Sequence, residues 1–233
     1  MLPLWDEIPT KKIPLITIIL IMLNSLIYFY QVFMVHDPNT FVYAYGLIPY
    51  EITKGVHLVS AVPSPIQLTI LTSMFMHGSF IHLFGNMLYL WIFGNNVEDY
   101  LGKIRFVLFY LLSGIFAALG QVLIAPNSTV PMIGASGAIA GVLGAYLLLF
   151  PRARITTLIF FGIFIRLVKL PAILVLGLWI VFQFFSGLSE LSLSKGAEGV
   201  AWFAHIGGFL AGILLIKLLP PRKNYYFQER QYR

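Results

Sequence analysis

Long uncharged, mainly apolar stretches make up most of the chain, and charged residues separate them. The uncharged runs cover residues 13–36, 55–97, 106–151, 170–189 and 199–216. A helix that crosses a membrane needs about 20 mainly apolar residues. The third run is too long for one such helix, and the turn-forming stretch APNSTVP at 125–131 divides it. We therefore predict six membrane-spanning helices, at about 13–35, 77–97, 106–125, 134–150, 170–188 and 199–217.

The charged residues between the runs predict how these helices are oriented. With the N-terminus in the cytoplasm, the inner segments hold 13 lysines and arginines, and the outer segments hold only Lys54 and Lys195. Such an excess of positive charge is typical of cytoplasmic loops. We therefore expect an all-α membrane protein with both termini in the cytoplasm. It has a cytoplasmic N-terminus at 1–12, a six-helix membrane domain at 13–218 and a basic cytoplasmic tail at 219–233.

The composition supports this class and excludes several others. Of the 233 residues, 59% are hydrophobic and 10% are charged, whereas a soluble domain carries about 25% charged residues. The chain has no cysteine, which excludes disulfides, thiol nucleophiles and Cys-ligated metal sites. The net charge of +6 is explained by the lysines and arginines of the predicted cytoplasmic segments, so it does not indicate a nucleic-acid partner. We expect contacts with the lipid bilayer instead.

Three further segments need an interpretation. The segment 36–76 is predicted to be a long outer loop, which Pro63 and Pro65 lead toward the second span. The apolar run 155–165 lies between arginines and is predicted to be either a cytoplasmic connection or an extension of a helix. The first span is longer than the apolar core of a signal peptide and no cleavage site follows it, so we expect it to be retained.

Polar residues inside the predicted spans are costly and therefore informative. The second span carries His77, His82 and Asn86 in HGSFIHLFGN, and Gln121 lies near the outer end of the third. His82 and Asn86 are four residues apart and share one helix face. His77 and His82 are five apart, which turns them about 140° from each other, so they do not form the pair of a helical zinc site. With no cysteine and no carboxylate inside the spans, we expect no metal ion and no cofactor.

Two more polar residues lie near the outer ends of predicted spans: Ser136 at the start of the fourth and His205 in the sixth. A helix N-terminus has backbone N–H groups without acceptors and a partial positive charge, which suit an oxyanion beside a serine nucleophile. Small residues line both helices: Gly134, Gly137, Gly141 and Gly144 around the fourth, and Ala204, Gly208 and Gly212 along the sixth. Such helices pack closely, so Ser136 and His205 can form the hydrogen bond that activates a nucleophile.

Each of these residues also has a simpler interpretation. A serine in a glycine-rich helix is usually a packing residue, and a single intramembrane histidine is usually a structural hydrogen-bond partner. Asn86 alone could hold two helices together. A small transporter or channel with His and Asn along its pathway is a further alternative. It predicts inverted repeats or an intramembrane carboxylate, and the sequence has neither.

The motifs HGSFIHLFGN, GASGA and AHIGGFLAG follow one another on the second, fourth and sixth predicted spans. Through them the sequence resembles the rhomboid family of intramembrane serine proteases. The resemblance implies that Ser136 is the nucleophile and His205 the general base of a Ser–His dyad. It also implies that Asn86 and His82 stabilise the oxyanion with backbone N–H groups near the serine, and that Gly134 offers backbone to that site.

The resemblance covers about residues 72–218, and the sequence departs from the family pattern at two places. A Trp–Arg pair that is usual in the first outer loop is replaced by Leu68 and Thr69. The residue four after the serine, often aromatic in the family and packed on the catalytic histidine, is Ala140. Three rings are candidates to take its place: Trp202, Phe203 and Tyr146.

The leading prediction is therefore an intramembrane serine endopeptidase that is a multi-pass protein of a prokaryotic cell membrane. The resemblance implies that its substrates are single-span membrane proteins, cleaved near the outer membrane face. The alternative is a catalytically inactive rhomboid-like protein that binds membrane clients, but such relatives have lost the serine or the histidine. Because hydrolysis consumes water, we also expect a polar cavity that opens to the outside above Ser136.

Overall fold

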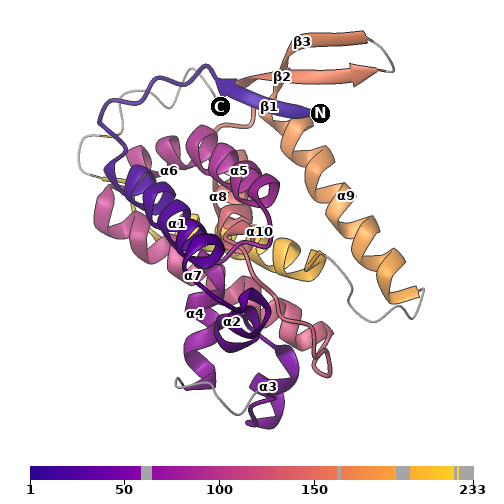
Figure 1. Ribbon diagram of the computed structural model, residues 1–233. Coiled ribbons are helices and arrows are strands. Elements are labelled where there is room, and N and C mark those ends of the chain that lie inside the picture. The colour runs from indigo at the N-terminus through magenta and orange to yellow at the C-terminus, as the bar shows by residue number, and fades with distance from the viewer. Residues whose placement is uncertain (59–64, 162–163, 193–199, 223–224, 226–233) are drawn as a thin grey trace.

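A computed structural model describes residues 1–58, 65–161, 164–192, 200–222 and 225 of the chain. Most of this part is helical, and a small sheet lies at one end of the helices (Figure 1). The long helical segments follow the apolar runs: α1 (Leu15–Phe33), α5 (Phe80–Tyr89), α6 (Asn95–Leu101), α7 (Lys103–Ile124), α8 (Ser136–Leu149), α9 (Ala172–Ser192) and α10 (Trp202–Leu218). A π-helical turn, η3 (Leu90–Gly94), joins α5 to α6.

Three helices in the described part of the chain, α1, α7 and α9, are long and apolar enough to cross a membrane. A fourth candidate is a bent pair, in which the segments Ile66–Phe75 and Phe80–Leu101 meet at 81°. The apolar helices α8 and α10 are shorter, with 14 and 17 residues, or about 21 and 26 Å at the rise of an α-helix. The described residues thus contain three to four candidate spans, and the six-span count and its orientation stay predictions.

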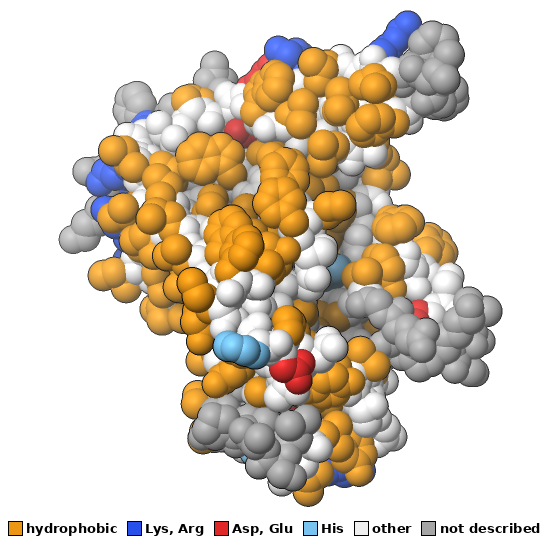
Figure 2. Space-filling view, viewed as in Figure 1, with side chains coloured by type: hydrophobic (Ala, Val, Ile, Leu, Met, Phe, Trp, Pro, Cys, Tyr) orange, Lys and Arg blue, Asp and Glu red, His pale blue; other side chains and the backbone are white. Residues whose placement is uncertain are grey.

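The outward faces of the long helices are apolar. Met22, Leu26 and Phe33 of α1 are more than half exposed, and so are Phe182 and Phe185 of α9. Figure 2 shows hydrophobic side chains over most of the visible face, with Lys and Arg mainly toward the end that carries the sheet. Soluble monomers rarely expose such an extended apolar surface, so this exterior is that of a membrane protein.

The predicted outer loop contains short helical elements, namely α2 (Pro38–Tyr45), α3 (Pro49–Lys54), η1 (Ile66–Leu68), α4 (Thr69–Thr72) and η2 (Ser73–Phe75). Leu47 and Met132 exchange two backbone hydrogen bonds of 3.0 and 2.7 Å. These bonds tie the loop that precedes α8 to this segment. Of the two prolines predicted to lead into the second span, Pro65 directly precedes η1, and Pro63 lies outside the described residues.

The prediction of an all-α chain is wrong at one end of the molecule, where three antiparallel strands form a sheet. In order, they are β1 (Leu2–Asp6), β2 (Arg154–Phe161) and β3 (Phe164–Pro171). The described residues of the run 155–165 therefore lie in a pair of strands between α8 and α9, and they do not extend a helix (Figure 1). Its β-branched and aromatic residues favour strands over helices. Most of the N-terminal half of β2 is buried, and the side chains of Ile155 and Thr157 are 0% exposed.

Helix α8 lies in the interior of the bundle, and the backbone of α10 packs directly against it. A Cβ atom at Gly208 would collide with the carbonyl oxygen of Gly137, and one at Gly212 would collide with that of Gly141. Glycine at these positions therefore lets two backbones touch. Because both residue numbers increase together along the contact, α8 and α10 run parallel, and their N-terminal ends lie side by side.

A buried carboxyl group joins the N-terminal strand to the helices. Asp6 of β1 accepts a hydrogen bond of 2.6 Å from the hydroxyl of Tyr146 in α8 and one of 2.7 Å from Nδ2 of Asn96 in α6. Burial raises the pKa of Asp6 to about 6 and outweighs these hydrogen bonds, which lower the pKa. The neutral form of this carboxyl is therefore favoured by the fold.

The first residues of the predicted basic tail pack against the helices. Arg222 forms an ion pair of 2.8 Å with Asp99 of α6, and its backbone N–H donates to the carbonyl of Tyr100. Arg105 of α7 donates to the carbonyl oxygen of Pro220 at 3.1 Å. The rest of the predicted tail, apart from residue 225, lies outside the described residues.

Candidate active site

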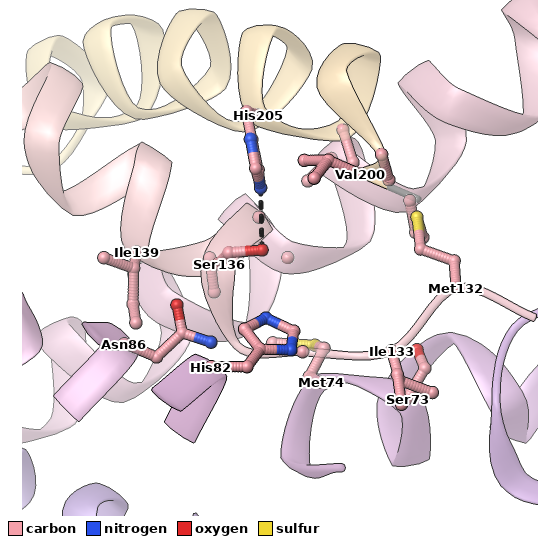
Figure 3. A pocket seen from close by; sticks show the side chains of 18 of the residues that line it. Ser73, Met74, His82, Asn86, Met132, Ile133, Ser136, Ile139, Val200 and His205 are labelled. Carbon is pink, nitrogen blue, oxygen red and sulfur yellow. Dashed lines mark hydrogen bonds between the residues drawn. The ribbon is translucent and has the colours of Figure 1, made fainter. Parts of the chain in front are cut away.

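Ser136 and His205 lie within hydrogen-bond distance, with His205 Nε2 2.8 Å from Ser136 Oγ (Figure 3). Ser136 is the first residue of α8, and His205 lies in the first turn of α10. The parallel contact between these two helices brings the residues together although 69 positions separate them in sequence. His205 is only 9% exposed. The serine and the histidine on which the sequence prediction depends are therefore direct partners in the fold.

The start of α10 is held in place by α7. Gln121, near the end of α7, accepts the backbone N–H of Ala204 through Oε1 at 3.2 Å. The two helices also meet at glycines, because a Cβ atom at Gly207 would lie 3.5 Å from Cα of Gly120. The polar residue of the third predicted span thus fixes the turn that carries His205.

The second ring nitrogen of His205 has a partner that lies outside the predicted site. Oε1 of Gln183 in α9 lies 2.8 Å from His205 Nδ1, and the side chain of Gln183 is 5% exposed. One helical turn earlier, Trp179 places its ring centroid 5.8 Å from that of the imidazole, with the planes tilted by 38°. An amide four residues after a tryptophan, inside an otherwise apolar run, is the sequence signal that could have indicated both residues.

Because residue 140 is alanine, the aromatic rings that contact His205 come from other positions. Ala140 is fully buried in α8 and offers no ring to the imidazole. Of the three candidate rings, Trp202 meets His205 edge-on, with the centroids 6.3 Å apart. Tyr146 instead lies at the sheet end, where its hydroxyl binds Asp6. The closer of the two tryptophans beside His205 comes from α9 and is not among the candidates.

Helix α5 presents His82 and Asn86 to the space in front of Ser136 (Figure 3). The helix begins after Ser79, whose hydroxyl accepts the N–H of His82 at 3.1 Å and caps the first turn. Asn86 is 8% exposed, and its Nδ2 has no hydrogen-bond partner among the described residues. A buried donor without a partner is costly, so this amide is available to an acceptor that enters the site.

A cavity of about 450 Å³ joins these side chains and is lined by Ser136, His205, His82, Asn86 and Gln183 together with many apolar residues. The lining is mainly apolar, whereas a polar cavity is predicted from the sequence. A second cavity, of about 270 Å³, also reaches His82. The two cavities share the loop before α8 and the two residues that precede α10 as walls.

Gly134, to which the resemblance assigns a backbone role in the oxyanion site, lies beside His82 in the loop before α8. Its φ is +128°, in the left-handed region that favours glycine. A Cβ atom there would lie 2.8 Å from the ring of His82, so the absent side chain makes room for this histidine. The N–H of Gly134 donates to the carbonyl of Ser73 at 2.9 Å. That donor already has an acceptor, and we do not include it in the oxyanion site.

Other residues singled out from the sequence lie away from the cavity. His77 is fully buried and packs edge-on against His82, with the ring centroids 5.1 Å apart. Leu68 belongs to η1 and Thr69 to α4, and the hydroxyl of Thr69 donates to the carbonyl of Ile66 at 2.6 Å. Within the described part of the chain, no three His, Asp or Glu side chains lie close enough together to hold a metal ion.

These side chains combine in a way that suits nucleophilic chemistry. A neutral imidazole can take the proton of the hydroxyl that it contacts. The first N–H groups of α8, at and after Ser136, have no acceptor within the helix. Together with the unpartnered amide of Asn86, they can stabilise negative charge on an oxygen beside the serine.

Known proteins with similar sequences share most of this region. The Rhomboid domain family model matches residues 67–222. Rhomboid protein 1, mitochondrial, of Saccharomyces cerevisiae is 31% identical over 157 residues, which are 64% of this chain and 40% of that protein. RHOMBOID-like protein 5 of Arabidopsis thaliana is 33% identical over 159 residues, or 67% of this chain and 46% of that protein. Rhomboid protease GluP of Bacillus subtilis is 42% identical over 78 residues, or 34% of this chain and 15% of that protein. The matches span less than half the length of these relatives.

Proposed function

The chain belongs to the rhomboid family, and on that premise we propose that it is an intramembrane serine endopeptidase that works through a Ser–His dyad. The observation that carries this proposal is the 2.8 Å contact between His205 Nε2 and Ser136 Oγ. A serine hydroxyl is a weak nucleophile until a neighbouring base takes its proton. One of the relatives, Rhomboid protease GluP, is named as a protease, which supports the same reaction class.

The reaction begins when Ser136 Oγ attacks the carbonyl carbon of the scissile peptide and its proton moves to His205 Nε2. The carbonyl oxygen becomes an oxyanion, which Asn86, His82 and the first N–H groups of α8 stabilise. The C–N bond then breaks, and His205 gives its proton to the leaving amine. Water attacks the acyl-serine with His205 again as the base, which releases the new carboxyl end and restores Ser136.

Water for the second half of the reaction has a route in the two cavities. Both reach His82, and both are bounded by Met132, Val200 and Ala201. In the proposed orientation, the route leads from the outer side of the membrane, because the loop before α8 lies outside. A mainly apolar lining is compatible with this role, since few polar groups compete with the substrate for the oxyanion donors.

The proposed arrangement in the membrane has six spans with both termini in the cytoplasm. The 14 residues of α8 extend about 21 Å, less than the roughly 30 Å of the hydrocarbon core. A helix of this length in the interior of the bundle can place its first residue, Ser136, below the outer surface. The positive-inside distribution of Lys and Arg supports the orientation.

We propose single-span membrane proteins as the substrates. Inside a bilayer the carbonyl and N–H groups of a helix are bonded to each other. A segment must therefore unwind before Ser136 can reach a carbonyl, and small or helix-breaking residues near the outer face favour unwinding. A prokaryotic cell membrane is the proposed location.

Covalent labelling with a fluorophosphonate tests the nucleophile. We expect the purified protein to be labelled on Ser136 and the variant Ser136→Ala to remain unlabelled. Ser113→Ala is the matched control, because it removes a buried hydroxyl from α7 outside the cavity, and it should be labelled like the unaltered protein. The alternative function, binding of membrane clients without catalysis, predicts that Ser136 is not labelled at all.

A further inference from the structure

We infer that Gln183 is a positioning residue of the catalytic site, which holds His205 in the tautomer that a general base requires. The inference rests on the proposed function and adds to the dyad a third side chain, from α9. Oε1 of Gln183 lies 2.8 Å from His205 Nδ1, and on the other side of the ring Nε2 lies 2.8 Å from Ser136 Oγ. The three side chains thus form a continuous chain of hydrogen bonds.

The chemistry of imidazole explains why the partner of Nδ1 matters. A neutral imidazole carries one N–H, and the nitrogen without hydrogen is the base. His205 can accept the proton of Ser136 at Nε2 only when Nδ1 bears the hydrogen. Gln183 favours this form, because its Oε1 accepts a hydrogen bond from Nδ1–H. If that acceptor were absent, the buried Nδ1–H would lack a partner, and the tautomer with hydrogen on Nε2 would become competitive.

Helix α9, and not α8, supplies the side chains that orient the imidazole ring of His205. Helix α8, which supplies the nucleophile, has only Ala140 one turn further on. Trp179 and Gln183 are four residues apart on one face of α9, so one face supplies both a ring cover and a hydrogen-bond acceptor. Residues on either side of this face point outward, with Phe182 61% exposed. Gln183 is therefore the amide on the inward side of a helix whose other side is apolar.

Gln183 is uncharged, which distinguishes this arrangement from a triad that ends in a carboxylate. An amide oxygen accepts from Nδ1–H but adds no negative charge to stabilise the imidazolium. The other titratable side chains that line the cavity with His205 are His82 and Tyr89 of α5. The imidazole also contacts the rings of Trp179 and Trp202 and the hydroxyl of Ser136. A carboxylate placed at position 183 would therefore be a new negative charge beside His205.

Two substitutions test the inference in protein reconstituted with a single-span substrate. Gln183→Met keeps the length of the side chain but removes the acceptor, and we expect kcat to fall about tenfold with little change in KM. Gln183→Glu keeps an acceptor and adds the charge, so cleavage should persist while the acidic limb of its pH–rate profile moves up by about one pH unit. Phe185→Leu, on the exposed face of the same helix, is the control. All rates are expressed per active site, with the active sites counted by fluorophosphonate labelling. The Tm of each variant is measured as well.

The outcomes separate this inference from the proposed function. If Gln183→Met folds and its kcat and pH profile match those of Phe185→Leu, the positioning role is overturned while Ser136-dependent cleavage stands. If Gln183→Met does not fold, the Glu variant decides: a displaced acidic limb supports the role, and an unchanged one contradicts it. If the unaltered protein shows no cleavage that depends on Ser136, the proposed function fails first, and the positioning role falls with it.

Discussion

The carbonyl oxygen of Gly141 in α8 occupies the place where a side chain at Gly212 in α10 would begin. The two backbones therefore touch, and the contact is repeated one turn earlier between Gly137 and Gly208. Small residues at such positions let helices approach within a membrane. This contact sets the separation of the two helix ends that carry Ser136 and His205.

Substitution at this contact is expected to damage both stability and activity. Gly212→Ala forces α10 away from α8, and overpacking of this kind costs about 1–3 kcal/mol. We expect a lower Tm in detergent and a reduced kcat, because the hydroxyl–imidazole contact opens. Gly177→Ala is the control, since a Cβ atom at Gly177 in α9 meets nothing within 4 Å. Equal Tm values for the two variants would contradict the close contact.

Removal of the unpartnered amide is expected to slow the chemical step. Asn86→Ala takes away the Nδ2 donor that has no partner in the described structure. Loss of one oxyanion donor reduces kcat by about 100-fold in serine proteases, and we expect a loss of this order with KM little changed. Steady-state cleavage of a reconstituted substrate provides the measurement. A rise in KM at constant kcat would instead assign Asn86 to substrate binding.

The buried carboxyl of β1 is expected to make stability depend on pH. The folded protein raises the pKa of Asp6 from 3.8 to about 6, so its stabilising effect is present below pH 4 and is lost as the pH rises through 6. By linkage the loss amounts to at most about 3 kcal/mol. Asp6→Asn keeps an acceptor for the Tyr146 hydroxyl and should have the higher Tm at pH 7, with no decline between pH 4 and 6.

Glu7→Gln is the comparison for this prediction. Glu7 is exposed, and its ion pair with Lys169 lowers its pKa, so this residue cannot produce a decline in that pH range. We expect the Tm of Glu7→Gln to follow that of the unaltered protein between pH 4 and 6. If the Tm of Asp6→Asn also declined between pH 4 and 6, the titration of a group other than Asp6 would be responsible.

The apolar runs and three motifs were sufficient to predict the long helices and the family, but not the short helices of the predicted outer loop. The family match confirms the resemblance, and the predicted helix ranges lie close to those of the structure. The sheet was missed in part because β1 pairs with β2 across about 150 residues, a contact that no local pattern reveals. The strands β2 and β3 follow each other in the chain and pair locally. In so hydrophobic a chain, β-branched residues are found in spans and strands alike.

Within the site, the sequence indicates the residues of the motifs but not what holds them. Gln183 and Trp179 belong to a run that looks like an ordinary span, and their importance follows from a contact with α10 that only the fold displays. The partner of the Gly134 N–H is likewise a carbonyl from a distant turn, at Ser73. Local spacing predicts which side chains share a helix face, whereas partners on other helices depend on how the helices pack.

The central claim is that Ser136 is a nucleophile activated by His205, and cleavage in a bilayer tests it most directly. The protein is reconstituted into liposomes with a single-span substrate that has helix-breaking residues near one membrane face. We predict that the unaltered protein and Ser113→Ala cleave this substrate, and that Ser136→Ala and His205→Ala do not. Cleavage by Ser136→Ala at the rate of Ser113→Ala would contradict the account.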